Sequence, residues 1–208
     1  MNKWTERLRA VLPADCTGLR PFVCNGFPCQ SEAIIIGKNP ATKLHTNWWD
    51  FWSDERGFEY AAFLSERKPK KRGARLRMEH MRVTRKVECV ETNVYRNEAQ
   101  RGEVEEKIAN VSVVELLLKN MPKLRAVIIH GAKARKFIDR DHRGQGIFKA
   151  LQPLEARGIK IFSMCHLCNA SYGCIDAVCD WIEANRLDKC ARCESNSPSQ
   201  CLENRPGA

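Results

Sequence analysis

The chain has 208 residues, of which 43% are hydrophobic and 29% charged, and Lys and Arg exceed Asp and Glu by ten. This composition suits one folded domain and excludes a disordered chain, and no run of about 18 apolar residues is present to span a membrane. The charged N-terminus lacks a signal-peptide core, so we expect a cytoplasmic protein, nucleoid-associated in a bacterium or nuclear in a eukaryote. The positive charge favours an anionic partner such as nucleic acid.

Four short apolar runs predict buried strands, and helical spacing fills the segments between them. The strands are expected over residues 33–37, 87–92, 126–131 and 159–164. Helices are expected over 6–12, with Thr5 as N-cap, and over 56–67, 103–120, 133–138, 147–157 and 174–186. This alternation predicts an α/β fold, a three-layer αβα sandwich with a central, mostly parallel four-stranded sheet. We expect one domain over residues 1–187 and a polar, cysteine-containing tail over 188–208.

Eleven cysteines, an odd number without a secretion signal, favour reduced thiols over a disulfide scaffold. Cys165 and Cys168, and later Cys190 and Cys193, have the C-x2-C spacing of zinc half-sites. The segment between the two pairs has a helical pattern, so we interpret its cysteines as small packing residues and expect no metal. A thiol or metal protein that uses this C-terminal half stays as an alternative.

The positive charge is concentrated in one segment. Residues 66–86 contain ten Lys or Arg and two Glu. Pro69 and Gly73 interrupt helical continuity there, which predicts an insertion that is partly a loop. Such a segment either follows a phosphate backbone or is a solvated insertion, and its composition alone does not decide between these two interpretations.

Ligands of α/β sheets bind beyond the carboxyl ends of the strands. The four predicted strands are followed by GKNPATKLHTNWWDFW, NVYRN, GAKAR and CHLCNASYG. These loops contain most of the polar and aromatic residues that a binding site needs. Since the carboxyl ends of parallel strands meet at one edge, the loops are expected to form one site.

The same four segments resemble, in order, the motifs of the uracil-DNA glycosylase superfamily. IIIGKNPAT is similar to the first motif, Gly-x-Asn-Pro or Gly-x-Asp-Pro after an apolar strand, in the form of the mismatch-specific and single-strand-selective branches. The second segment, VECVETNVYRN, resembles the strand that ends in the base-recognising Asn. The third segment, LRAVIIHGAKA, resembles the next strand of the family and the turn from glycine into a helix that follows it. IFSMCHLCNAS resembles the last motif, usually His-Pro-Ser or Asn-Pro-Ser. The resemblance covers residues 35–190 approximately.

The resemblance implies a monofunctional hydrolase that acts on DNA. Enzymes of this family flip uracil or a related deaminated or mismatched base out of the stack and hydrolyse its N-glycosidic bond. They need no metal or redox cofactor, and a flipping enzyme with one site is expected to be a monomer. A catalytically inactive nucleic-acid-binding protein of the same fold is the alternative.

The family's functional residues are carried over by position. Asn39 matches the residue that positions the attacking water. His166 matches the residue whose side chain donates a hydrogen bond to uracil O2, where negative charge develops. Asn93 matches the base-reading Asn, because an amide offers a donor and an acceptor to O4 and N3–H of uracil. Trp49 or Phe51 is expected to stack on the flipped base.

Further residues are expected to contact the base or the DNA backbone. Ala41 stands where some branches have a bulky Tyr, so exclusion of thymine is in question. Contacts to DNA phosphates are expected from Lys43, Lys70, Lys71, Arg72, Arg75 and Ser171. Arg96 and Lys133 are expected close to the opening of the predicted site and are further candidates for phosphate contacts.

The last motif departs from the family. His166-Leu167-Cys168-Asn169 replaces His-Pro-Ser-Pro, and the small Ala170 falls near the position of the wedge residue. In an alternative register Asn169-Ala170-Ser171 stands for Asn-Pro-Ser. The sequence leaves both registers open.

Overall fold

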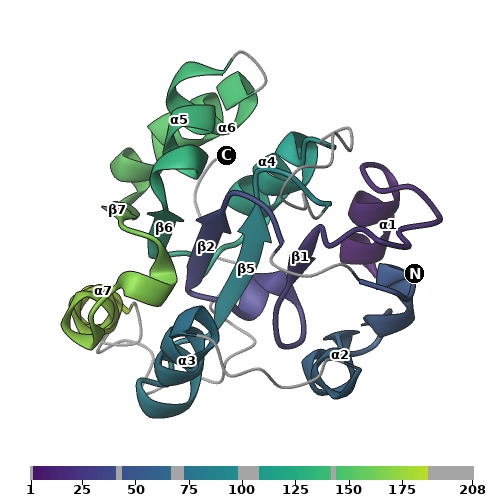
Figure 1. Cartoon of the computed structure of the whole chain (residues 1–208), viewed down its shortest axis with the longest axis horizontal. Helices are drawn as coiled ribbons and strands as arrows, with labels where there is room; N and C mark the ends of the chain where they lie inside the picture. The colour runs from purple at the N-terminus through teal and green to yellow at the C-terminus, as the bar shows by residue number, and fades with distance from the viewer. Residues whose placement is uncertain (1, 41–43, 67–72, 98–107, 142–143, 187–208) are drawn as a thin grey trace, which may run out of the picture.

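The computed structural model describes residues 2–40, 44–66, 73–97, 108–141 and 144–186. At its centre is a five-stranded sheet with the order β1-β5-β2-β6-β7 (Figure 1). Its strands are β1 (Phe22–Val23), β2 (Ala33–Gly37), β5 (Cys89–Asn93), β6 (Ala126–His130) and β7 (Lys160–Met164). The mixed α/β class is confirmed. All four predicted strands are present, but β1 makes the sheet five-stranded, where four strands were expected.

The strands β5, β2, β6 and β7 are parallel, and β1 pairs antiparallel with β5. Gly37 is the register partner of Asn93, and His130 that of Met164. The last residues of β5, β2 and β6 therefore lie next to one another at one edge of the sheet. Side chains at equivalent register positions of neighbouring parallel strands project from the same face.

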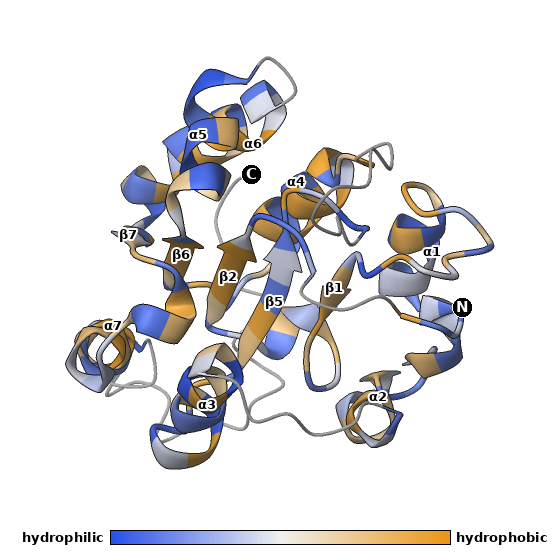
Figure 2. Cartoon of the chain, viewed as in Figure 1, coloured by the Kyte–Doolittle hydropathy of each residue, from blue (hydrophilic) through white to orange (hydrophobic). Residues whose placement is uncertain are grey.

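Alternate residues of β2 enter two separate hydrophobic clusters, so both faces of the sheet are covered. Ile34 and Ile36 belong to the first cluster, and Ala33 and Ile35 to the second. Figure 2 shows that β2 and β6 are hydrophobic over most of their length, as strands buried on both faces should be. The first cluster receives residues from α1 (Lys3–Arg9), α2 (Tyr60–Ser65), α4 (Val111–Asn120), α5 (Ala132–Arg140) and α6 (Gln145–Leu151).

The second cluster receives residues from α3 (Gly73–Glu79) and α7 (Tyr172–Ala184). A π-helical turn, His80–Thr84, continues α3. The described part of the basic insertion thus contains a helix, while residues 67–72, with Pro69, lie outside the described residues, so the expected loop there stays a prediction. Gly73 begins this helix: a Cβ at Gly73 would come 2.9 Å from the carbonyl oxygen of Cys168, so the missing side chain lets α3 approach the loop after β7.

Several helix boundaries differ from the sequence expectation for local reasons. Asn2, not Thr5, caps α1, because its side chain accepts from the N–H of Trp4, while the buried Thr5 donates to Asp54. The helix α4 begins only at Val111, since the backbone N–H of Ile108 is bound by the side chain of Asn97. Residues 152–157, which include Pro153, form a 3-10 helix after α6.

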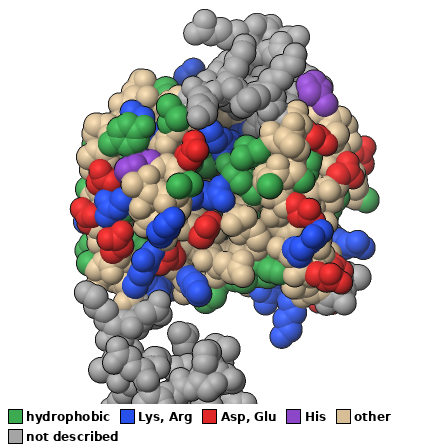
Figure 3. Space-filling model, turned by 90° about the horizontal axis from the view of Figure 1, so that it is seen from below, with side chains coloured by type: hydrophobic (Ala, Val, Ile, Leu, Met, Phe, Trp, Pro, Cys, Tyr) green, Lys and Arg blue, Asp and Glu red, His purple; other side chains and the backbone are tan. Residues whose placement is uncertain are grey.

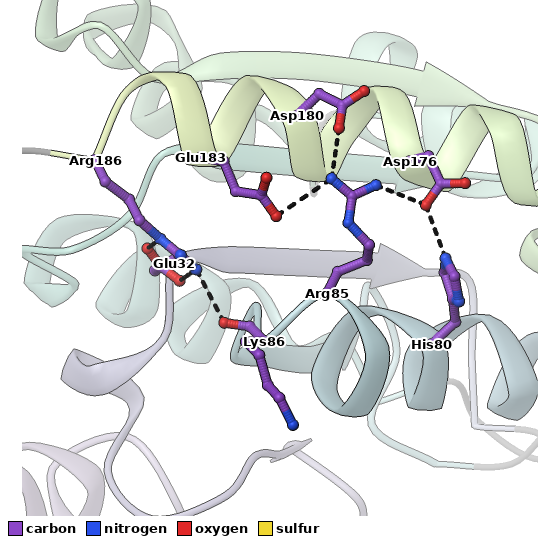
Figure 4. A network of polar contacts seen from close by, with 8 residues as sticks. All are labelled: Glu32, His80, Arg85, Lys86, Asp176, Asp180, Glu183 and Arg186. Carbon is purple, nitrogen blue, oxygen red and sulfur yellow. Dashed lines mark hydrogen bonds and ion pairs between the residues drawn. The ribbon is translucent and has the colours of Figure 1, made fainter.

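Ion pairs join the segment that follows α3 to helix α7, on the second face of the sheet (Figure 4). Arg85 contacts three carboxylates of α7, at 2.8 Å from Asp176, 2.5 Å from Asp180 and 3.2 Å from Glu183. His80 Nε2 also lies 2.8 Å from Asp176. The described part of the basic insertion is thereby joined to α7. Within the described ranges no helix has the length and apolar character needed to cross a membrane.

Candidate functional site

Three strand ends bring two polar side chains over one glycine. A Cβ placed on Gly37 would lie 2.6 Å from Asn93 Oδ1 and 2.7 Å from His130 Nε2. Because both atoms occupy the space that a side chain would need, a residue larger than glycine would displace one of them. We call Gly37, Asn93 and His130 the strand-end cradle.

Asn93 lies in the cradle at the end of β5, where the resemblance places a base-reading amide. The residue is only 4% exposed, and the amide nitrogen Nδ2 is buried without a hydrogen-bond partner within the described ranges. Its backbone carbonyl accepts from Asn110 Nδ2, which holds the strand end in place. A buried amide donor without a partner is costly, and a ligand acceptor would remove that cost.

His130 was not among the residues that the sequence analysis selected. Burial, together with repulsion from His166, lowers its pKa to about 4, and Glu91 opposes this shift. The ring is therefore neutral at physiological pH. Its Nδ1 accepts from the backbone N–H of Leu167 at 3.4 Å, so we assign the ring proton to Nε2, the atom over Gly37.

His166 follows β7, which pairs with β6 on the edge opposite to β2, and its ring lies beside that of His130. The two rings meet edge to face, with centroids 5.0 Å apart and planes at 85°. His166 is exposed and begins the short 3-10 helix Leu167–Asn169, and its Nδ1 accepts from the N–H of Cys168. The Cys168 Sγ lies 2.9 Å from the same Nδ1. With Nδ1 engaged, Nε2 is the ring atom left for a ligand.

Asn39 and the other residues of the first motif follow Gly37. Asn39 is partly buried, and its Nδ2 donates to the carbonyl of Pro40 at 3.1 Å, which leaves Oδ1 available to a water molecule. Its position two residues after Gly37 puts it at the same edge of the sheet as the cradle. Ala41 and Lys43 lie outside the described residues.

The two stacking candidates occupy different environments. Phe51 is only 3% exposed and packs at right angles to Phe63, with ring centroids 5.7 Å apart. It is a core residue of the first cluster, without a free face for a base. Trp49 donates from Nε1 to the carbonyl of Pro13 at 2.8 Å and keeps part of its surface exposed. Of the two, Trp49 alone has surface available for stacking.

The candidate phosphate-binding residues are distributed over several elements. Lys70, Lys71 and Arg72 lie outside the described residues. Arg75 points into the protein, where its guanidinium lies 3.2 Å from Glu91 and donates to the hydroxyl of Tyr60. Arg75 therefore has an internal partner, which the sequence analysis did not foresee.

Two further candidates sit at helix starts. Ser171 is the N-cap of α7, and its hydroxyl accepts from the N–H of Cys174 at 3.2 Å. Lys133 is exposed in the first turn of α5. Arg96, in contrast, is partly buried, and its Nε has no partner in the described chain. Figure 3 shows Lys and Arg interspersed with Asp and Glu on the face seen from below.

Glu91 supplies the negative charge closest to the cradle along β5. It lies two residues before Asn93 and pairs with Arg20 at 2.9 Å as well as with Arg75. The Arg20 side chain is 5% exposed and that of Glu91 15%, so this is a mostly buried pair. Removing Glu91 would take this carboxylate away from the mostly buried guanidinium of Arg20, which is costly.

The described residues contain no group of three or more His, Cys, Asp or Glu arranged to hold a metal ion. Their eight cysteines are free thiols, and Cys165, Cys168 and Cys174 are exposed. Cys190, Cys193 and Cys201 lie outside the described residues.

Comparison with known proteins finds no match for this chain, either among protein-family models or among curated proteins.

Proposed function

We propose that the protein is a DNA glycosylase that flips uracil, or a related deaminated or mismatched base, out of DNA and hydrolyses its N-glycosidic bond. The proposal includes a three-layer αβα arrangement of the uracil-DNA glycosylase kind. The observation that carries it is the buried, unpartnered Nδ2 of Asn93 at the strand end. A base with a carbonyl at this position would provide the missing acceptor.

The reaction needs little covalent chemistry from the protein. The bond between the sugar C1′ and the base nitrogen breaks, and its electron pair leaves with the base. Water then adds to C1′ and loses a proton to solvent. Asn39 Oδ1 orients this water, and the exposed His166, with Nε2 free of the Cys168 contact, stabilises the charge on the departing base.

The test uses oligonucleotides that carry one uracil, either single-stranded or in a U·G pair, followed by alkaline cleavage of abasic sites. We expect cleavage with the wild-type protein and a loss of at least about 100-fold in Asn93→Ala, because a base held without its positioning contacts rarely reaches the reactive geometry. Asn120→Ala is the matched control, since the side chain of Asn120 bonds within α4.

Two outcomes would contradict the proposal. Uracil, xanthine and hypoxanthine could all stay uncleaved, or cleavage could be equal in Asn93→Ala and the wild type. Salt-sensitive DNA binding without base release, unchanged in Asn39→Ala, would identify a nucleic-acid-binding protein of the same fold.

A further inference from the structure

The donors and acceptors of the strand-end cradle have a definite order. Along the sheet edge, Asn93 ends β5, Gly37 ends β2 and His130 ends β6. Asn93 Oδ1 and His130 Nε2 both border the space above Gly37, and Asn93 Nδ2 is the other atom of the same amide. Since His130 Nδ1 accepts from Leu167, its Nε2 carries the proton. The cradle thus presents donor, acceptor and donor, in the order His130 Nε2–H, Asn93 Oδ1 and Asn93 Nδ2–H.

A pyrimidine imide has the complementary edge. The 2-carbonyl, N3–H and 4-carbonyl of uracil present acceptor, donor and acceptor. Cytosine presents an acceptor at N3 and a donor at N4, and hypoxanthine has no carbonyl at the position equivalent to O2. The three groups of the cradle therefore match an imide better than either of these bases.

His130 also lies nearer to Asn93 than His166 does in the order of the site. In the strand order β5-β2-β6-β7, His130 ends β6, whereas His166 follows β7. The ring of His166 packs edge to face against the His130 ring, and its Cδ2 lies 3.7 Å from a Cβ placed on Gly131, which follows His130. A base held by Asn93 over Gly37 meets His130 first. The burial that keeps His130 uncharged also keeps its other nitrogen an acceptor for Leu167.

We propose that His130 is a base-reading residue, whose Nε2–H donates to the 2-carbonyl of a pyrimidine imide while Asn93 binds the N3–H and the 4-carbonyl. This inference rests on the proposed function for the choice of a nucleobase as ligand. It goes further by assigning the 2-carbonyl contact to β6 and not to the last motif. It also makes the imide, and not a single carbonyl, the feature that is recognised.

The experiment compares free uracil with 4(3H)-pyrimidinone, the same ring without the 2-carbonyl, by NMR titration of the wild-type protein. We expect uracil to bind about tenfold more tightly, since a neutral hydrogen bond and the cost of leaving its buried donor unpaired together have this size. The imidazole Nε2 resonance of His130 should shift with uracil and stay in place with 4(3H)-pyrimidinone.

Two variants separate the two ring nitrogens. His130→Asn places an amide near Nδ1, so it keeps an acceptor for Leu167 and loses the donor over Gly37. His130→Gln reaches the position of Nε2 and keeps that donor. We expect the tenfold preference for uracil to disappear in His130→Asn and to persist in His130→Gln. His166→Gln is the comparison for the other ring, and it should retain the preference.

The outcomes distinguish this inference from the proposed function. A preference that is equal in wild type and His130→Asn, or one that disappears only in His166→Gln, would overturn the role of His130 even if uracil is released from DNA. Binding of uracil with the expected loss in His130→Asn, but without base release, would support base reading and contradict glycosylase activity. Failure of the wild type to bind uracil at millimolar concentration and to release it from DNA would overturn both. If His130→Asn does not fold, the resonance shift in the wild type decides.

Discussion

The ring of His130 stands edge to face against the ring of His166, with centroids 5.0 Å apart. Both rings have Nδ1 engaged by a backbone N–H of the turn that follows β7, from Leu167 and Cys168 respectively. Both therefore direct Nε2 away from that turn. One short 3-10 helix thus orients two imidazoles, which sit side by side at the edge where the parallel strands end.

The neutral and mostly buried His130 should make stability depend on pH. Its pKa is lowered to about 4 in the folded protein, by burial and by His166, with Glu91 opposing, against about 6.5 in an unfolded chain. Between these values the unfolded chain binds more protons, so the free energy of unfolding falls as the pH falls from 6.5 to 4. The full loss is about 3 kcal/mol and is complete below pH 4.

Denaturant unfolding at a series of pH values measures this effect. His130→Gln removes the titrating ring, so its unfolding free energy should vary less between pH 6.5 and 4. His45→Gln, at an exposed histidine, is the control and should follow the wild type. An equally steep dependence in His130→Gln would show that another group causes it.

Gly37→Ala should impair the cradle more than the fold. The new methyl group would lie under 3 Å from both Asn93 Oδ1 and His130 Nε2, so these side chains have to move. We expect base release to fall by about 100-fold, as for a displacement of about 1 Å in a reactive site, and stability to fall by roughly 1–3 kcal/mol. Oligonucleotide cleavage and denaturant unfolding measure the two effects.

Gly173→Ala is the matched control for that substitution. In the first turn of α7 its methyl group would meet only Ser171 Oγ, at 3.8 Å. Helix propensity then favours alanine by up to about 1 kcal/mol. Wild-type cleavage by Gly37→Ala would show that the cradle is not used.

Arg85→Met should lower the melting temperature, because Arg85 joins the basic insertion to three carboxylates of α7. Hydrogen bonds from His80 and Arg85 lower the pKa of Asp176, so the contact weakens in strong acid. Arg135→Met removes an exposed pair within α5 and serves as control. Thermal unfolding should show a larger decrease for Arg85→Met, and equal melting temperatures would remove the proposed role of the network.

Neutralising Lys70, Lys71 and Arg72 should weaken DNA binding and flatten its salt dependence. Each lost phosphate contact reduces the slope of log K against log salt by up to about 0.9. The chemical step at saturating DNA should change little. Arg75→Gln should instead lower stability, since it leaves Glu91 with one partner fewer. Equilibrium binding at several salt concentrations measures the slope, and an unchanged slope in the triple variant would identify the segment as a solvated insertion.

The local pattern of apolar residues was sufficient to predict the four parallel strands. A strand buried on both faces needs a run such as Ile34–Ile36 whatever surrounds it, so its signal is local. The end of the strand is local as well, and for this reason Asn93 and Gly37 were both expected at the sheet edge. His130 carried a signal of the same kind, a polar residue ending an apolar run, but the motif resemblance assigned the histidine role to His166.

Tertiary structure alone decided which side chains meet. The register between β2, β5 and β6 places Asn93 and His130 over Gly37, and register depends on the pairing of segments far apart in the chain. The same holds for Arg85, whose partner Asp176 is 91 residues away. Composition established that the 66–86 segment is basic, whereas packing determined that Arg75 pairs with Glu91 inside the protein and that Arg85 pairs with the carboxylates of α7. A guanidinium that is largely removed from water, as in Arg75, requires a carboxylate that only the fold can supply.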